Sequence, residues 1–216
     1  MNKKAVIIGA STIVNHNVLS NYLDSFIIAC DKGYEECLKE NIEPDILIGD
    51  FDTLDTSLIK NPKNTIKLNP IKDDTDTFFV VKYLLEKGFN EIHFFGCLGN
   101  KIDHTIGNIQ ILSYLKDNNV NGYLHSEDDS QIIFMLKNES FSFKKNLKGM
   151  VSIFSFTNIS KNVTIKNMKY NIENYELSSS IPLGVSNELI LDSKENGYVN
   201  VEEGKLLVIG PKDSIL

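Results

Sequence analysis

Short apolar runs alternate with helix-like segments through the first half of the chain. The runs at residues 5–8 and 91–95 each end at a glycine, which is typical of buried strands in a parallel sheet. Between such runs, apolar residues recur at helical spacing, most clearly over residues 74–87, where Gly88 provides a stop. The expected elements are strands at 5–8, 25–30, 46–48, 65–68 and 91–95, and helices at 34–41, 56–60, 74–87 and 103–116. This alternation predicts a doubly wound, largely parallel α/β sheet domain.

The pattern changes after about Gly122. Short runs rich in β-branched and aromatic residues follow, separated by turn residues and without a helical period. The strands expected there cover residues 131–136, 139–143, 150–156, 162–166, 188–191, 197–201 and 206–209. Regularly spaced short strands predict a smaller all-β sandwich or barrel domain. We therefore expect an α/β domain at residues 1–127 and a β domain at residues 128–216.

The charge of the chain limits the kinds of ligand and partner that it can bind. The 216 residues carry a net charge of −7, and the 22 basic residues are all lysines. Without a basic stripe to displace counterions, we expect no nucleic-acid partner. A phosphate site in this chain cannot use the bidentate fork of arginine, so it must rely on lysine, backbone N–H groups and metal.

Cysteine and histidine spacing argues against zinc and disulfides. Cys30, Cys37 and Cys97 lack the C-x-x-C spacing, and we expect reduced, mostly buried thiols. The histidines show no metal-ligand spacing. No apolar run approaches the ~20 residues of a membrane span, and the N-terminus suits a first strand better than a signal peptide. We expect a cytoplasmic protein without a membrane partner.

Two carboxylates, Asp50 and Asp52, follow an apolar run that ends at Gly49. A strand that stops there presents both acids at its carboxyl end, where open α/β sheets bind ligands. Mg²⁺ bound with phosphates needs only one or two protein carboxylates, because water and substrate oxygens complete its shell. We therefore predict a Mg²⁺–nucleotide site; the alternative is a solvated turn with Asp50 as a helix cap. Phe51, between the two acids, is expected to point into the protein.

Acids follow the other strands of this domain as well. Asp73 and Asp76, next to Lys72, stand at the start of the clearest helix, where acids also serve as ordinary caps. The full set that follows successive strands is Asp31, Asp50, Asp52, Asp73, Asp76 and Asp103. Separate caps would explain each acid, whereas one metal–phosphate cleft explains them together.

A glycine-rich turn, Gly96-Cys97-Leu98-Gly99, leads from the last of these strands to a helix start. Glycines let the backbone approach a ligand closely, and helix N-termini attract anions. The turn matches neither the P-loop nor the dinucleotide fingerprint. Asp103 is a candidate cap of the following helix. We expect His104 to be an ordinary, partly exposed histidine, because a catalytic role lacks an evident orienting partner.

The order of these motifs resembles that of the thiamine pyrophosphokinases. The resemblance rests on Pro44-Asp45-Ile46-Leu47-Ile48-Gly49-Asp50-Phe51-Asp52, Lys72-Asp73-Asp74-Thr75-Asp76, Gly96-x-x-Gly99-x-x-x-Asp103-His104 with Asn108, and Ser186-Asn187-Glu188. It covers nearly the whole chain, and the G-D-F-D and K-D-x-T-D pair is its most specific part. The resemblance implies transfer of a diphosphate from ATP to the hydroxyl of thiamine, giving thiamine diphosphate and AMP. It also implies a homodimer with active sites between the subunits.

The resemblance further implies a role for each motif. Mg²⁺ would be held by Asp50, Asp52, Asp73 and Asp76, with Asp103 as a further catalytic acid. A carboxylate such as Asp76 or Asp103 is a candidate to accept the hydroxyl proton, and the sequence does not assign that role. The phosphates of ATP would lie against Asp31, Lys72, Gly99, Lys101 and His104. Thiamine would lie against Ser186 and Asn187, in the partner subunit's site.

The chain departs from the family pattern at Lys32, Thr53 and Lys101, where the family often has glycine, serine and arginine. Lys101 keeps the positive charge but lacks the guanidinium fork, so ATP would be contacted differently there. Three rival functions fit parts of the pattern. They are a pyrophosphokinase for another aromatic alcohol such as a hydroxymethylpterin, a D-x-D glycosyltransferase, and a non-enzymatic sensor of nucleotide or thiamine.

Overall fold

The computed structural model describes residues 3–52, 54–60, 64–69, 74–99, 101–191 and 195–215. The chain divides into two compact units, Met1–Asp129 and Ser130–Leu216. The boundary expected after residue 127 falls two residues before this division. Within the described ranges, no helix is both long enough and apolar enough to cross a membrane.

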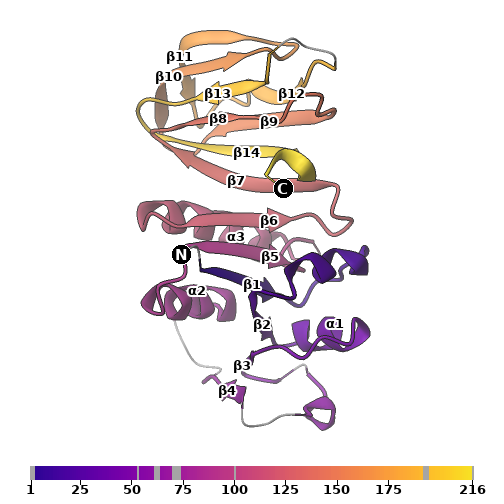
Figure 1. Ribbon diagram of the computed structural model, residues 1–216. Coiled ribbons are helices and arrows are strands. Elements are labelled where there is room, and N and C mark those ends of the chain that lie inside the picture. Colours follow the sequence, from indigo (N-terminus) through magenta and orange to yellow (C-terminus); the bar gives the residue numbers. More distant parts are fainter. Residues whose placement is uncertain are drawn as a thin grey trace. The chain divides into compact units, whose positions relative to one another are not determined.

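The first unit is built on a parallel sheet with the strand order β6-β5-β1-β2-β3-β4 (Figure 1). Its elements are β1 (Lys4–Ile8), η1 (His16–Tyr22), β2 (Phe26–Cys30), α1 (Gly33–Lys39), β3 (Ile46–Gly49), η2 (Thr56–Leu58), β4 (Thr65–Lys67), α2 (Asp76–Glu86), β5 (Glu91–Phe95), α3 (Ile102–Asp117) and β6 (Asn121–His125). The predicted doubly wound α/β sheet is confirmed. Strand order reverses between β1 and β5, and open α/β sheets bind ligands at such a switch point.

Apolar side chains cover both faces of this sheet, as parallel sheets between helices require. On one face, Val6 of β1 and Ala29 of β2 belong to a buried cluster that also contains Leu19 of η1 and Cys37 of α1. The alternate residue Ile7 is equally inaccessible. Helix α2 contacts β1, β2 and β3, and α3 contacts β6. Packing of this kind fixes where the loops at the carboxyl ends of the strands begin.

The second unit consists of two antiparallel sheets, with strand orders β12-β9-β14-β7 and β11-β10-β13-β8. Its elements are β7 (Gln131–Lys137), β8 (Ser140–Ser142), β9 (Met150–Ser155), β10 (Ile159–Lys166), β11 (Ile172–Ser178), β12 (Gly184–Glu188), β13 (Tyr198–Asn200), β14 (Lys205–Pro211) and η4 (Lys212–Ser214). The rings of Phe134 on β7 and Phe141 on β8 lie 4.8 Å apart and join the two sheets. The expected smaller all-β domain is confirmed.

The sequence pattern does not predict η1, β6 or β11, and it misplaces one strand. Asparagine, glycine and histidine are depleted in strands, yet Asn121–His125 pairs with β5 and becomes β6. Strand β11 has four consecutive exposed positions, so it lacks the alternation that marks a half-buried strand. The strand expected at residues 188–191 lies earlier, because pairing with β9 places β12 at Gly184–Glu188.

Candidate functional site

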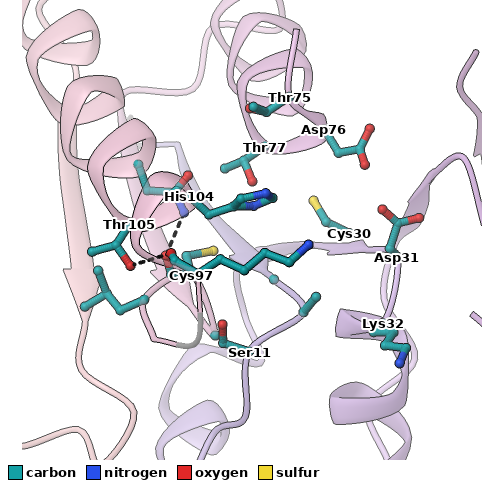
Figure 2. A pocket seen from close by; sticks show the side chains of 16 residues that line it. Ser11, Cys30, Asp31, Lys32, Thr75, Asp76, Thr77, Cys97, His104 and Thr105 are labelled. Atoms are coloured by element: carbon teal, nitrogen blue, oxygen red, sulfur yellow. Dashed lines mark hydrogen bonds between the residues drawn. The ribbon is translucent and has the colours of Figure 1, made fainter. Parts of the chain in front are cut away.

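A cavity of about 400 Å³ lies at the switch point, at the carboxyl ends of β1, β2 and β5; we call it the first cavity. Figure 2 shows the side chains that line it. Its lining residues are Gly9, Ala10, Ser11, Cys30, Asp31, Lys32, Thr75, Asp76, Thr77, Gly96, Cys97, Leu98, Lys101, His104, Thr105 and Asn108. The walls are therefore loops after three strands and the first turns of α2 and α3, which is where a doubly wound sheet binds an anionic ligand.

The carboxyl groups of Asp31 and Asp76 face each other on one side of the first cavity (Figure 2). Two acids so close need a proton or a cation between them. Burial, followed by the hydrogen bond and charge of Asp76, raises the pKa of Asp31 to about 7. A shared proton that is so easily lost near neutral pH leaves a pair of oxygen ligands for a hard divalent cation.

The turn after β3 holds Asp31 in place. The N–H of Phe51 donates to Asp31 Oδ1 at 3.2 Å. A Cβ atom at position 49 would lie 1.8 Å from the same oxygen, so Gly49 leaves the space that the carboxylate needs. Phe51 has a φ of 62° and packs against the hydrophobic core, which confirms its expected inward orientation. Asp31 itself has a φ of 45°, a conformation uncommon outside glycine and often found at functional sites.

The two acids of the Gly49–Asp52 turn do not act alike. Asp50 is partly buried, and its charge helps to raise the pKa of Asp31, so it belongs with the Asp31–Asp76 pair. Asp52 is exposed, and its N–H donates to Asp50 Oδ1 at 3.1 Å. Neither residue lines the first cavity. In the described part of the chain, no three carboxylate, histidine or cysteine side chains are gathered closely enough to hold a metal ion.

Helix capping resolves two of the alternatives raised by the sequence. The hydroxyl oxygen of Thr75 accepts the N–H of Phe78 at 3.2 Å and caps α2, so Thr75 takes the capping role considered for Asp73. Helix α3 begins at Ile102 without a side-chain cap. Asp103 lies inside its first turn and accepts the N–H of His104 at 3.0 Å, so the expectation that Asp103 caps α3 is wrong. Lys72 and Asp73 lie outside the described residues.

The residues assigned to the ATP phosphates lie together only in part. Asp31, Lys101 and His104 line the first cavity. Gly99 has a φ of 115°, and a Cβ there would lie 2.0 Å from Glu127 Oε1, so a side chain is excluded at that point of the turn. The side chain of Lys32, in contrast, points away from Asp76 (Figure 2). Both lysines line the first cavity, and they differ in the direction of their side chains.

Four residues that sequence reasoning left unassigned also line the first cavity: Ser11, Thr75, Thr77 and Asn108. Asn108 is buried, and its Nδ2 donates to the carbonyl oxygen of Cys97 at 2.6 Å, which ties α3 to the glycine turn. An asparagine among the apolar positions of α3 is a detectable signal, because a buried amide must find a partner. Ser11 gives no such signal, since serine is common in loops of every kind.

A second cavity of about 520 Å³ lies between α2 and α3. It shares Thr75, Thr77, His104 and Asn108 with the first cavity, so the two spaces adjoin. The remaining lining residues are Asp74, Phe78, Asp103, Gly107, Gln110, Ile111 and Tyr114. The rings of Phe78 and Tyr114 lie 5.0 Å apart, edge to face. Asp74 already pairs with Lys82, whose Nζ lies 5.1 Å from the centre of the Phe78 ring, so the two rings and Asp103 are what this cavity offers to an aromatic cation.

Ser186 and Asn187, assigned to thiamine, lie on β12 of the second unit. Ser186 is exposed, has a φ of 58°, and its N–H donates to Ser152 Oγ at 3.1 Å. Asn187 is buried: its Oδ1 accepts the N–H of Tyr170 at 3.0 Å, and its Nδ2 donates to the carbonyl oxygen of Tyr170 at 2.7 Å. The amide of Asn187 therefore holds the main chain at Tyr170, whose side chain is 63% exposed.

The fold and this site define a class: an α/β protein with an acidic, glycine-walled cavity at its switch point, followed by an all-β unit. Comparison with known families places the chain within that class. Residues 19–124 match the family model described as "Thiamin pyrophosphokinase, catalytic domain", and residues 138–206 match "Thiamin pyrophosphokinase, vitamin B1 binding domain". The chain belongs to the thiamin pyrophosphokinase family.

Individual relatives agree with this placement. A thiamine pyrophosphokinase from Bacillus subtilis (strain 168) is 28% identical, over 90% of this chain and 92% of that protein. The crystal structure of thiamine pyrophosphokinase from Bacillus subtilis superposes with a TM-score of 0.82 at 26% identity, over 97% of this chain and 99% of that one. Thiamin pyrophosphokinase from Candida albicans has the same fold, with a TM-score of 0.77 at 16% identity, covering 97% of this chain and 89% of that one.

Proposed function

We propose that this protein is a thiamine diphosphokinase, which transfers a diphosphate group from ATP to the hydroxyl of thiamine and releases AMP. The observation that carries the proposal is the pair of adjoining cavities in the first unit. One is walled by backbone turns, helix N-termini and a carboxyl pair, and the other by aromatic rings and acids. The matches to catalytic and vitamin-binding models support the same reaction.

The ATP phosphates would occupy the first cavity. The N-terminal ends of α2 and α3 border it, and helix N-termini favour negative charge. Lys101 adds a cation at the start of α3. Since the chain contains no arginine, backbone N–H groups and lysines are the means of binding phosphate besides a metal.

The residues at the first cavity fit Mg²⁺. Asp31 and Asp76 present a close pair of carboxyl groups, the pKa of Asp31 is raised to about 7, and the charge of Asp50 acts on Asp31 as well. Two such oxygen donors suffice for Mg²⁺ when phosphate oxygens and water complete its shell. When bound, the ion would supply positive charge to the phosphates. We therefore propose Asp31 and Asp76 as its holders, with Asp50, Asp52 and Asp73 as the further acids implied by the family resemblance.

Thiamine would approach from the second cavity. It is a cationic aromatic molecule, and Phe78 and Tyr114 offer rings while Asp103 offers negative charge. Its hydroxyl oxygen would attack the β-phosphorus of ATP at the shared wall, the bond from that phosphorus to the oxygen of AMP would break, and the hydroxyl proton would pass to a carboxylate. We propose Asp103 for this transfer, and its position in the lining of the second cavity beside His104 supports that role.

We propose that the active form is a homodimer in which the second unit of one copy supplies Ser186, and the segment held by Asn187, to the thiamine site of its partner. The second unit supports this with large exposed apolar side chains on β11, β12 and the segment between them: Tyr175, Ile181, Leu183 and Val185. Exposed apolar residues gathered in this way mark interaction surfaces.

The free, buried cysteines suit the cytoplasm, where we place the protein.

The reaction is tested by incubating the protein with ATP, Mg²⁺ and thiamine and measuring AMP and thiamine diphosphate by chromatography. A hydroxymethylpterin replaces thiamine in a parallel reaction. We expect equal amounts of AMP and thiamine diphosphate, no product with the pterin and none without Mg²⁺. Asp76→Asn should lower turnover by about 100-fold or more, whereas Asp24→Asn, an exposed acid of the same unit, should not. AMP release with the pterin alone would refute the proposal.

The dimer is tested by light scattering after size-exclusion chromatography. We expect the mass of two chains for the wild type and of one chain for Leu183→Glu, because a charge in an apolar interface is costly to bury. Leu23→Glu, at a leucine of the first unit that is equally exposed, is the matched control and should stay dimeric. A wild-type protein with the mass of one chain would refute the dimer and leave the reaction untouched.

A further inference from the structure

A network of four titratable groups, Glu91, His93, His125 and Asp129, lies in the first unit away from both cavities; three of them are buried, and the side chain of Glu91 is 18% exposed. His93 Nε2 lies 3.1 Å from Glu91 Oε1, and His93 Nδ1 lies 3.0 Å from His125 Nε2. His125 Nδ1 in turn lies 3.0 Å from Asp129 Oδ1. The exposed fraction is 1% for each histidine and 2% for Asp129. Neither the reaction nor the substrate sites use any of these groups.

With both carboxyl groups ionised, the three contacts need one more proton than two neutral imidazoles provide. Each of the three contacts needs one proton between its two atoms. A neutral imidazole has one N–H and one acceptor nitrogen, so two neutral rings supply two protons. The third contact would then set a ring lone pair against a carboxylate lone pair, either at the buried Asp129 or at the partly buried Glu91. An imidazolium removes that repulsion, because both of its nitrogens donate.

The surroundings assign the extra proton to His125. Burial lowers the pKa of His93 to about 4, so His93 is neutral near pH 7. Lys4 Nζ lies 2.9 Å from Glu91 Oε1, so that carboxylate already has a cation beside it. The rings that pack around the two imidazoles are those of Tyr22, Phe95 and Tyr123. With His125 charged, Lys4 balances Glu91 and His125 balances Asp129, so the buried group is neutral as a whole.

The His125–Asp129 contact closes the turn that follows β6. The N–H of Asp129 donates to the carbonyl oxygen of Ser126 at 2.9 Å. Between them, the carbonyl oxygen of Glu127 accepts the N–H of Val14 at 2.8 Å. The carboxylate of Glu127 lies against Gly99, with Oε1 2.0 Å from the position of a Cβ there. One turn therefore touches both the loop after β1 and the glycine turn after β5.

Those two segments are walls of the first cavity, through Gly9, Ala10 and Ser11 on one side and Gly96, Cys97 and Leu98 on the other. His125 also stacks on Phe95, the last residue of β5, with ring centroids 4.0 Å apart. The carbonyl oxygen of Phe95 accepts the N–H of Gly9 at 2.8 Å. The network that includes His125 thus packs against the two segments that form these walls of the first cavity.

We propose that His125 is a positioning residue, held as an imidazolium between His93 and Asp129, which fixes the turn at residues 126–129 and through it the walls of the nucleotide cavity. The role in catalysis rests on the proposed function, whereas the protonation state does not. Loss of the contact should loosen both walls together and weaken nucleotide binding. The rate of the chemical step in an occupied site should change less, because none of the four groups Glu91, His93, His125 and Asp129 lines either cavity.

Nitrogen-15 NMR of the imidazole rings in the ligand-free wild type tests the protonation state directly. We expect one buried histidine with both ring nitrogens protonated and one that is neutral, near pH 7. In Asp129→Asn, the amide N–H can donate to His125 Nδ1, so all three contacts survive with both rings neutral. The imidazolium signal should therefore vanish in this variant. Two neutral rings in the wild type would overturn the proposal, whatever the enzyme activity.

Positioning is tested with the same variant and a disruptive one. Asp129→Ala should weaken the binding of Mg²⁺–ATP, measured by calorimetry, by about tenfold, the effect of losing one charged hydrogen bond. Asp129→Asn should restore affinity to within about threefold of the wild type, and Asp24→Asn is the surface control. Equal affinity in Asp129→Ala, with the folded state verified by circular dichroism, would overturn the positioning role. Normal nucleotide binding without turnover would refute the proposed reaction and leave this inference intact.

Discussion

Replacing Asp31 by asparagine should stabilise the metal-free protein while it removes activity. The carboxyl group of Asp31 lies close to that of Asp76 in a partly buried site. Burial and the neighbouring Asp76 raise the pKa of Asp31 from 3.8 to about 7. Between these two values, the folded state binds more protons than the unfolded state does. The free energy of unfolding therefore falls as pH rises through that range. Asparagine keeps the shape, and its amide can donate to Asp76 without carrying a charge.

The magnitude follows from the shift. A rise of about three pKa units would correspond to about 4 kcal/mol at 1.36 kcal/mol per unit. Asp31 is only about half buried, so solvent screening reduces this to about 1–2 kcal/mol. We expect Asp31→Asn to exceed the wild type by that amount at about pH 8 and to equal it at about pH 4.

Urea denaturation in the presence of EDTA, at both pH values, measures the difference. Asp24→Asn is the control, because it removes an exposed acid and should leave the pH dependence of stability unchanged. Addition of Mg²⁺ and ATP should stabilise the wild type and leave Asp31→Asn nearly unaffected. A variant that is less stable than the wild type at pH 8 without metal would refute the reasoning, since the carboxylate would then be stabilising as an anion.

Three further predictions use other parts of the structure. Gly49→Ala should lower turnover by about tenfold or more, because its Cβ would displace the Asp31 carboxylate. The same overpacking should cost about 1–3 kcal/mol of stability. An unchanged turnover rate would exclude a role for the Asp31 carboxylate. Acidification from pH 6.5 to about 4 should remove about 3 kcal/mol of stability, because the unfolded state protonates His93 before the folded state does. In His93→Gln, the free energy of unfolding should fall less steeply with acidification than in the wild type. An equally steep fall would assign the loss of stability to other groups. Tyr114→Ala should raise the KM for thiamine by about tenfold, with the KM for ATP unchanged; steady-state kinetics with each substrate varied would show the reverse if the second cavity held the nucleotide.

The broad architecture could be predicted from the sequence because it depends on local patterns. Apolar runs ending at glycine, with helical spacing between them, require parallel strands covered on both faces, and that sheet is present in the first unit. Strand β6 and strand β11 escaped prediction because their residues favour strands only through the neighbours that they pair with. The positions of the acids at strand ends could also be predicted, since the carboxyl ends of parallel strands lie at one edge of the sheet.

Which acids meet was decided by the tertiary structure alone. Spacing along the chain paired Asp50 with Asp52, but the left-handed backbone at Phe51 turns its ring into the core and leaves Asp52 exposed. The carboxyl pair that the structure forms joins Asp31, after β2, to Asp76, at the start of α2. These two residues are far apart in the sequence, and no local pattern encodes their contact. The sequence determined that acids would collect at one edge of a parallel sheet, and only the packing of helices and turns against that sheet determined which of them share a proton.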